Sequence, residues 1–145
     1  ARMEDITAHT LTADDTQVLF RDNHLEKIGS PIITTGNELV GDEIVTFSKG
    51  LNISGLLRYA GDVRASTDEL LRDLSFEDTK RRFDDEDRRR VFASKCVSED
   101  ESAAWLIDYW CGKDVAGIIR MPFTRHLIMH IKAMMRIARK IGIEI

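Results

Sequence analysis

The strongest constraint in this sequence is a helix-period pattern of apolar residues between Asn52 and Leu74. Apolar side chains recur there at spacings of three and four residues, which places them on one side of an α-helix of about six turns. They are Ile53, Leu56, Leu57, Ala60, Val63, Leu70, Leu71 and Leu74, with Thr67 among them. A helix of this length must bury that side against other elements, so the pattern predicts a helical core.

Two more helices are predicted in the second half of the chain. Ser98 and Glu101 have the spacing of a capping box, so a helix should begin there and end near Gly112. The last helix should begin at about Pro122, because proline is tolerated in the first turn, and should end near Gly142.

The remaining segments are less regular. Thr12, followed by two aspartates, is typical of a helix start. The segment from Ile32 to Phe47 contains two glycines and fits a loop, a short hairpin or an extension of the first helix. Ser75 to Val97 is so charged that we expect a surface connection with one short helix at most.

Size and composition indicate one domain, residues 1–145, of the all-α class. A chain of 145 residues can bury one core, and strand-like alternation is confined to one short region. The net charge of −4 argues against nucleic-acid or anionic-membrane binding. No apolar stretch reaches the length of a membrane span, no signal-peptide pattern opens the chain, and two cysteines without CxxC spacing suit a reducing compartment, so we expect a cytoplasmic protein.

His126 and His130 in the last predicted helix are the main candidates for chemistry. A spacing of four residues places both imidazoles on one face, and the same face continues through Met134, Ile137 and Ile141. The pair is therefore expected to face the core. Such a pair is either two ligands of a transition metal ion or two structural histidines with hydrogen-bond partners.

Two sequence strings resemble the DinB-like family. The string MPFTRHLIMH, residues 121–130, is similar to the start of that family's last helix, and LNISGLLRYAGD, residues 51–62, is similar to its second helix. With matching order and spacing, the resemblance covers residues 51–141, and the first 50 residues match only as a plausible first helix.

The resemblance implies a four-helix bundle with up-down-down-up connectivity, a homodimer and, in many relatives, a divalent metal ion such as Zn or Ni. Some relatives are thiol-dependent transferases or isomerases. The family's metal ligands are one histidine from the second helix and an H-x3-H pair from the last helix. His126 and His130 match that pair.

The third ligand departs from the family pattern, because Tyr59 stands where the second-helix histidine is expected. A phenol must lose a proton with a pKa near 10 to bind metal well. Asp62, one turn beyond Tyr59, and Asp108 on the third predicted helix could each supply a carboxylate instead. His9 and His24 would serve only if the fold brought them inward, and both are expected at the surface.

A site without metal is the other interpretation of these residues. Tyr59 could then hydrogen-bond to one of the two histidines, and Tyr59 and Asp62 would belong to a polar pocket around His126 and His130. Trp105 is a further candidate for the wall of a ligand pocket, and aromatic residues of its kind also occur in cores and dimer interfaces.

These residues support three alternative functions, and no catalytic residue can be assigned. The first is a DinB-like, divalent-metal-dependent thiol transferase with a pocket around the histidine pair. The second is a non-catalytic dimeric helical domain that binds a small molecule or a protein partner without metal. The third is a purely structural or regulatory interaction domain.

Overall fold

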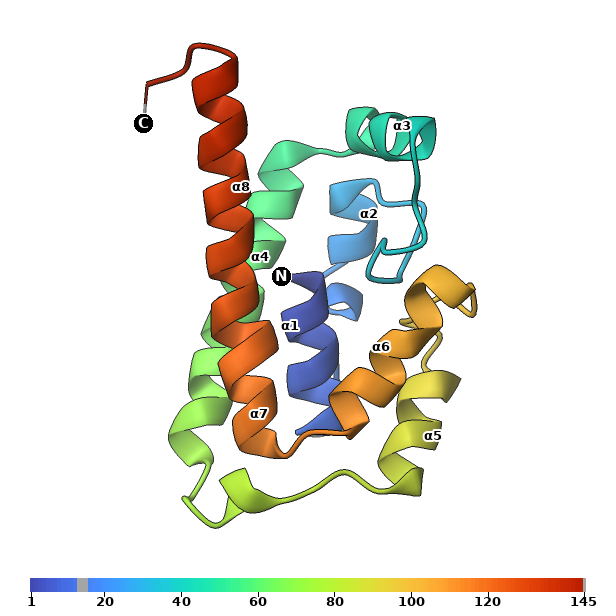
Figure 1. Ribbon diagram of the computed structural model, residues 1–145, viewed down its shortest axis with the longest axis vertical. Helices are drawn as coiled ribbons and strands as arrows, with labels where there is room; N and C mark the ends of the chain where they lie inside the picture. Colours follow the sequence, from blue (N-terminus) through green and yellow to red (C-terminus); the bar gives the residue numbers. More distant parts are fainter. Residues whose placement is uncertain (13–15, 145) are drawn as a thin grey trace.

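The computed structural model describes residues 1–12 and 16–144, and it confirms the all-α class (Figure 1). Its α-helices are α1 (Arg2–Ile6), α2 (His24–Ile28), α3 (Asp42–Gly50), α4 (Ile53–Asp73), α5 (Asp85–Ala93), α6 (Glu101–Cys111), α7 (Val115–Arg120) and α8 (His126–Lys140). Two π-helical segments, Thr7–Leu11 and Met121–Arg125, and two 3-10 turns, Val18–Phe20 and Asp78–Lys80, complete the regular structure. The described residues form no strand beyond one isolated bridge between Arg82 and Asp114.

The first helix lies earlier in the chain than predicted. α1 and the π-helical segment Thr7–Leu11 form one helical stretch that ends at Thr12, where the sequence suggested a start. The Thr12 hydroxyl donates back to the carbonyl of Ala8, as it does at the end of a helix. The aspartates of the expected start, residues 14 and 15, lie outside the described residues.

The segment from Ile32 to Phe47 is a loop followed by a helix. The chain is irregular up to Gly41, and α3 then begins at Asp42. Ile44 to Phe47, which favours extended structure by composition, lies in this helix, whose first turn carries the favourably placed acidic residues Asp42 and Glu43. The hairpin alternative is therefore wrong.

The long helix α4 confirms the clearest prediction. Asn52 caps it by accepting a hydrogen bond from the Gly55 amide, and Tyr59, Val63 and Thr67 are its buried residues. Gly55 allows the close approach of α2, since a Cβ atom there would lie 2.2 Å from the Lys27 carbonyl oxygen.

α5 is the short helix expected within the charged connection. Asp84 caps it, and the Asp87 side chain accepts from the Asp84 amide to complete a capping box. The predicted cap of α6 is wrong by two residues: Asp100, not Ser98, accepts from the backbone amide of Ser102. The C-terminal boundary at Gly112 is confirmed.

The last helix begins seven residues before the predicted position. α7 starts at Val115, where the Asp114 side chain accepts from the Gly117 amide, and it continues through Met121–Arg125 into α8. Pro122 therefore lies inside a helical run, and the widened π-helical turn accommodates its missing N–H. The end near Gly142 is confirmed by its left-handed backbone and by the Ile143 amide, which donates to the Ala138 carbonyl.

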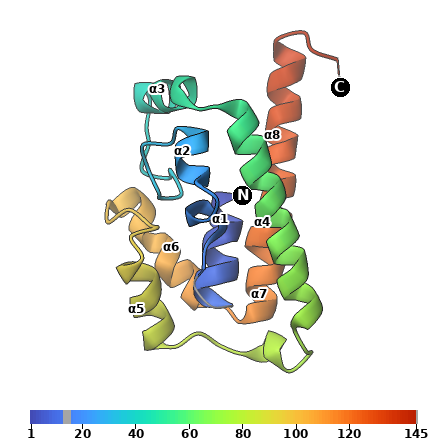
Figure 2. The ribbon, with the colours of Figure 1, turned by 180° about the vertical axis from the view of Figure 1, so that it is seen from behind.

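α1 and the segment that follows it lie at the centre of the fold. α4 and the α7–α8 run lie on one side of α1, and α5 and α6 lie on the other (Figures 1 and 2). The main core is formed by Ile6, Ala8, Leu11, Val91, Cys96, Val97, Ala103, Leu106, Trp110, Cys111, Ile118 and Phe123. A second cluster joins α2 to α4 through Val18, Leu19, Ile28, Tyr59 and Val63.

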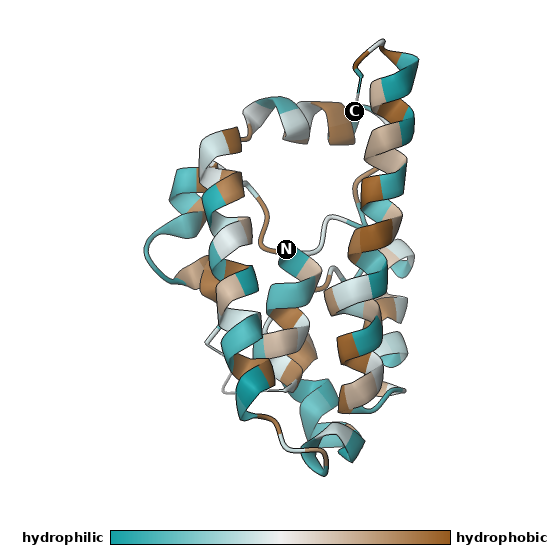
Figure 3. Cartoon of the chain, turned by 90° about the vertical axis from the view of Figure 1, so that its left-hand side faces the viewer, coloured by the Kyte–Doolittle hydropathy of each residue, from teal (hydrophilic) through white to brown (hydrophobic). Residues whose placement is uncertain are grey.

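α8 does not bury the apolar stripe that the sequence placed in the core. Met134, Ile137 and Ile141 are 66%, 59% and 66% exposed, and no described residue of α8 is fully buried. Figure 3 shows why: α8 stands opposite α4, and the N-terminal end of α1 reaches only partway up between them. Within the described chain, no helix combines the length and apolarity needed to span a membrane.

Candidate functional site

The two histidines of the last helix lie in direct contact. His126 Nε2 is 3.0 Å from His130 Nε2, and the rings meet edge to face with centroids 4.4 Å apart. A hydrogen bond between these atoms requires one ring to donate and the other to accept. The helical spacing thus brings two ring nitrogens to one point, as the sequence predicted. His130 is exposed and His126 half-buried, however, so the pair lies at a pocket rim and not in the core.

The pair lines a pocket of about 460 Å³ between α1, the loop around Gly36 and the start of α8. Arg2 and Glu4 contribute from α1, and Pro122 and Leu127 contribute from the last helix. A pocket of this size can hold a small ligand.

The environment of His126 favours its neutral form. Burial lowers the pKa of His126, and the neighbouring His130 lowers it further. A neutral imidazole is the form that binds a metal ion, so the shift extends metal binding to lower pH.

Glu4 is a buried carboxylate on the wall of the same pocket. It is only 8% exposed, and its Oε1 atom accepts no hydrogen bond from any described residue. Burial raises the pKa of Glu4, while nearby Thr67 and Arg64 lower it by less. A carboxyl group with a raised pKa keeps its proton to higher pH than an exposed glutamate does, which suits it to proton transfer.

The geometry suits a two-point metal chelate. A tetrahedral Zn ion with Zn–N bonds of about 2.0–2.1 Å would place its nitrogen ligands about 3.3 Å apart, close to the separation of the two Nε2 atoms. Across residues 1–12 and 16–144, however, no three His, Cys, Asp or Glu side chains are grouped closely enough to bind one ion. Protein side chains thus offer two of the ligands, and the other positions would remain open.

Tyr59 does not contact the histidine pair. It is 2% exposed, and its hydroxyl donates to Asp5 Oδ2 at 2.8 Å. Burial raises the pKa of Tyr59, and the adjacent Asp5 raises it further, so the phenol keeps its proton. The expected hydrogen bond between Tyr59 and His126 or His130 is therefore wrong.

The other predicted pocket residues lie apart from the pair. Asp62 Oδ2 is 3.1 Å from His24 Nε2, and Asp108 forms an ion pair with Arg88. Trp105 is half-exposed on α6, and its indole N–H donates to a carbonyl of its own helix. None of the three lines the pocket of His126 and His130.

His9 and His24 are buried, although both were expected at the surface. His24 is 2% exposed, and its ring lies 5.6 Å from that of Tyr59. His9 is 4% exposed, and its Nε2 atom is 3.0 Å from the Ser66 hydroxyl. Each histidine joins the N-terminal region to α4. The local sequence around either histidine does not predict this contact, because it depends on how the two segments pack.

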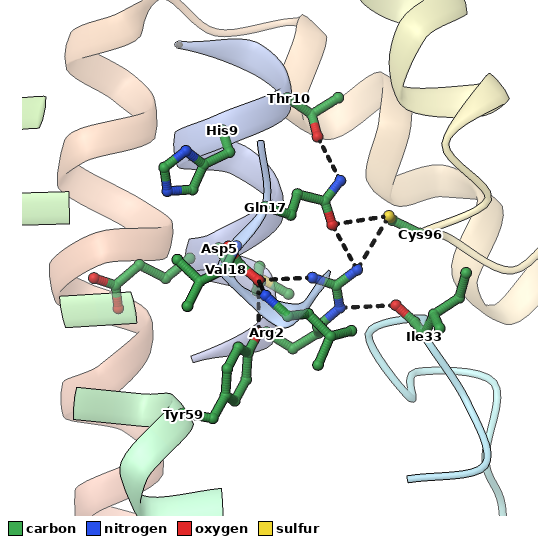
Figure 4. A network of polar contacts seen from close by, with 12 residues as sticks. Arg2, Asp5, His9, Thr10, Gln17, Val18, Ile33, Tyr59 and Cys96 are labelled. Atoms are coloured by element: carbon green, nitrogen blue, oxygen red, sulfur yellow. Dashed lines mark hydrogen bonds and ion pairs between the residues drawn. The ribbon is translucent and has the colours of Figure 1, made fainter. Parts of the chain in front are cut away.

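Sequence reasoning missed a polar network around Arg2, which Figure 4 shows. The guanidinium donates to Asp5 Oδ2 at 2.9 Å, to Gln17 Oε1 at 2.7 Å and to the Ile33 carbonyl at 2.7 Å, and it lies 3.1 Å from Cys96 Sγ. Four segments distant in sequence therefore meet at one side chain. An arginine at the second position carries no local pattern that could have revealed this role.

Comparisons with protein-family models, curated proteins and solved structures gave no match to this chain.

Proposed function

We propose that this chain is a DinB-like protein that binds one divalent transition metal ion, Zn or Ni, through His126 and His130. The observation that carries the proposal is the 3.0 Å approach of the two Nε2 atoms at the mouth of a pocket. The lowered pKa of His126 supports it, because the ligating form of the ring is favoured. The resemblance of residues 51–62 and 121–130 to the DinB-like helices supports the same assignment.

The proposed reaction is a group transfer that involves a thiol substrate, the activity that the resemblance implies. A bound divalent ion would supply Lewis-acid chemistry and favour the thiolate form of a coordinated thiol. The two imidazoles would hold the ion, and its remaining positions would face the pocket. Glu4, with its raised pKa, would accept or release a proton at its carboxyl group on the opposite wall.

The lack of a third protein ligand beside His126 and His130 in the described part of the chain has a consequence for affinity. Two imidazoles without a third protein ligand bind a metal ion more weakly than a three-histidine site does, because fewer bonds form and more water stays bound. We therefore expect metal binding that is stoichiometric but readily reversed by a chelator.

Isothermal titration calorimetry with Zn and Ni, together with metal analysis of the purified protein, tests this proposal. We expect one ion per chain, and a loss of at least tenfold in affinity in His126→Ala and in His130→Ala. His24→Gln is the matched control, because His24 is a histidine of the same chain that faces Asp62. Unchanged metal affinity in both alanine variants, or equal loss in the control, contradicts the proposal.

A domain that binds a small molecule without metal is the second candidate. The observation that favours it is the lack of a third ligand among the described residues. In that case His126 and Glu4 act as hydrogen-bonding groups of the pocket, and chelation changes neither stability nor ligand binding.

The four-helix bundle, the homodimer and the cytoplasmic location complete the proposal. α1, α4, α6 and the α7–α8 run would be the four helices, but α1, α4 and α6 run in one direction along the molecule and the α7–α8 run goes back the other way (Figure 1), which differs from the up-down-down-up order that the resemblance implies. Trp105 and Tyr109, which pack edge to face on the exposed side of α6, are the residues through which we expect the dimer to form. Light scattering on Trp105→Ala tests this contact.

A further inference from the structure

A second cavity adjoins the histidine pocket and has a different lining. It measures about 210 Å³, and Arg2, Thr35 and Gly36 line both spaces, so the two share part of a wall. Neither histidine of the pair lines the second cavity, and neither does Glu4. Most of its wall is apolar and comes from α2, α3, α4 and the 3-10 turn Val18–Phe20. We call this second space the apolar cavity.

The floor of the apolar cavity belongs to the second core cluster. Leu19, Ile28 and Tyr59 line the cavity and are themselves buried, and Leu56 of α4 packs against the same cluster. The Asn52 amide donates to the Ile28 carbonyl at 2.8 Å, which fixes the start of α4 on the end of α2. The floor therefore consists of side chains that the rest of the fold holds in place.

The cover of the apolar cavity is formed by residues 34–51, which include Phe47 of α3. Before this segment the Ile33 carbonyl accepts from Arg2 Nε at 2.7 Å (Figure 4), and after it Asn52 is fixed on α2. Between these two anchors, α3 has no buried residue and lies beyond α2 at one end of the molecule (Figures 1 and 2). A segment with so little buried surface can open without unfolding the rest of the chain.

Polar side chains in the wall of the apolar cavity have partners within the protein. Arg2, the charged residue of the wall, is paired with Asp5 at 2.9 Å, and the Tyr59 hydroxyl donates to the same carboxylate at 2.8 Å. The hydroxyls of Ser30 and Thr34 donate to groups of their own loop. A charged ligand would lose its hydration there and meet an arginine that is already neutralised, whereas an apolar ligand has no such cost.

We propose that the apolar cavity binds a small uncharged molecule of the size of a substituted benzene ring, with residues 34–51 as its lid. Protein interiors are close-packed, and a cavity of about 150 Å³ lined by aliphatic and aromatic side chains is enough to bind benzene. A cavity of about 210 Å³ has room for a ring and a short substituent. This site is independent of a metal ion at His126 and His130, because neither histidine lines it.

Titration of the ¹⁵N-labelled chain with ethylbenzene, followed by ¹H–¹⁵N correlation spectra, tests the proposal. Benzoate and benzylammonium are the matched probes, because each has a benzene ring with a substituent of similar size that carries a charge. We expect ethylbenzene to bind saturably at millimolar concentration and to shift the amide signals of residues 28–36 and 47–59. The two ions should bind at least tenfold more weakly.

Leu56→Trp should abolish the binding of ethylbenzene, because the larger side chain fills the apolar cavity from its floor. Leu57→Trp is the matched control, since Leu57 is the next residue of α4, is 68% exposed and does not line the cavity. The control should bind ethylbenzene as the unmodified chain does. Circular dichroism checks that both variants keep their helices.

Phe47→Ala tests the lid, in a helix that has no buried residue. Removal of this ring from the cavity wall should weaken the binding of ethylbenzene at least fivefold. Ile44→Ala is its control, because Ile44 is 50% exposed on the same helix and does not line the cavity. This second pair of variants tests the site even if Leu56→Trp does not fold.

Two kinds of result would overturn the proposal. If ethylbenzene does not bind saturably, or if each variant and its control lose binding equally, the cavity takes no apolar ligand. If benzoate binds as tightly as ethylbenzene, Arg2 makes the cavity an anion site instead. Metal content tests the proposed function separately, because none of these variants changes His126 or His130.

Discussion

The Tyr59 hydroxyl donates a hydrogen bond of 2.8 Å to Asp5 Oδ2, and this contact joins α4 to α1 inside the protein. The same carboxylate accepts from the backbone amides of Val18 and Leu19 at 2.7 and 3.0 Å and from the guanidinium of Arg2. A buried carboxylate with four donors is fully satisfied, so the loss of any one donor should be measurable.

Tyr59→Phe should lower the free energy of unfolding by about 1.5–3 kcal/mol, because it removes a hydrogen bond to a charged group. Urea unfolding measures this difference. Tyr109→Phe is the control, because Tyr109 is 37% exposed on α6, and its loss should cost less than about 0.5 kcal/mol. Equal stability of the two variants would show that the Asp5 contact contributes nothing.

Tyr59→His should leave Zn affinity unchanged. The DinB-like pattern would place a histidine at position 59 beside His126 and His130, but here the side chain points to Asp5 and lies outside their pocket. Calorimetric titration of the variant checks this. A tenfold gain in affinity would show instead that a side chain at position 59 reaches the histidine pair.

Gly55→Ala and Gly61→Ala should have opposite effects on stability. A Cβ atom at position 55 would lie 2.2 Å from the Lys27 carbonyl oxygen, so α2 would have to move away from α4, at a cost of about 1–3 kcal/mol. Position 61 of the same helix has open space, and alanine there should stabilise by about 0.5–1 kcal/mol. Thermal unfolding of both variants distinguishes the two environments.

Asp100→Ala should destabilise the protein more than Ser98→Ala. The Asp100 side chain accepts from the Ser102 amide at the start of α6, and removal of such a cap costs about 1 kcal/mol. Ser98 accepts from the amide of Asp100, outside the helix, and its side chain caps no helical amide among the described residues. A larger loss of stability in Ser98→Ala than in Asp100→Ala would instead support the Ser98 capping box expected from the sequence.

Glu4→Gln should raise the melting temperature near neutral pH. Burial raises the pKa of Glu4 in the folded protein above its ordinary value of 4.5. As the pH rises above 4.5, Glu4 therefore ionises in the unfolded chain before it does so in the folded protein. The free energy of unfolding then decreases with pH until the pH exceeds the pKa of Glu4 in the folded protein. The advantage of glutamine should therefore shrink toward pH 4. A difference in melting temperature that is constant with pH would indicate a role unrelated to ionisation.

The histidine pair shows how far local sequence can predict a site. The four-residue spacing of His126 and His130 was enough to place both rings on one face, because helical geometry fixes that relation. It could not place Tyr59, Asp62, Trp105 or Asp108 relative to the pair. Their positions depend on how separate helices pack, and each of the four side chains has a partner elsewhere.

The helical class, the long helix α4 and the ends of α6 and α8 were determined by the sequence itself. Periodic apolar spacing and glycine conformation act over a few neighbouring residues, so they can be read without a structure. The tertiary structure decided that His9 and His24 are buried, that Arg2 joins distant segments, and that the stripe from Met134 to Ile141 is exposed. Burial depends on which distant segments cover a surface, and no local pattern contains that information.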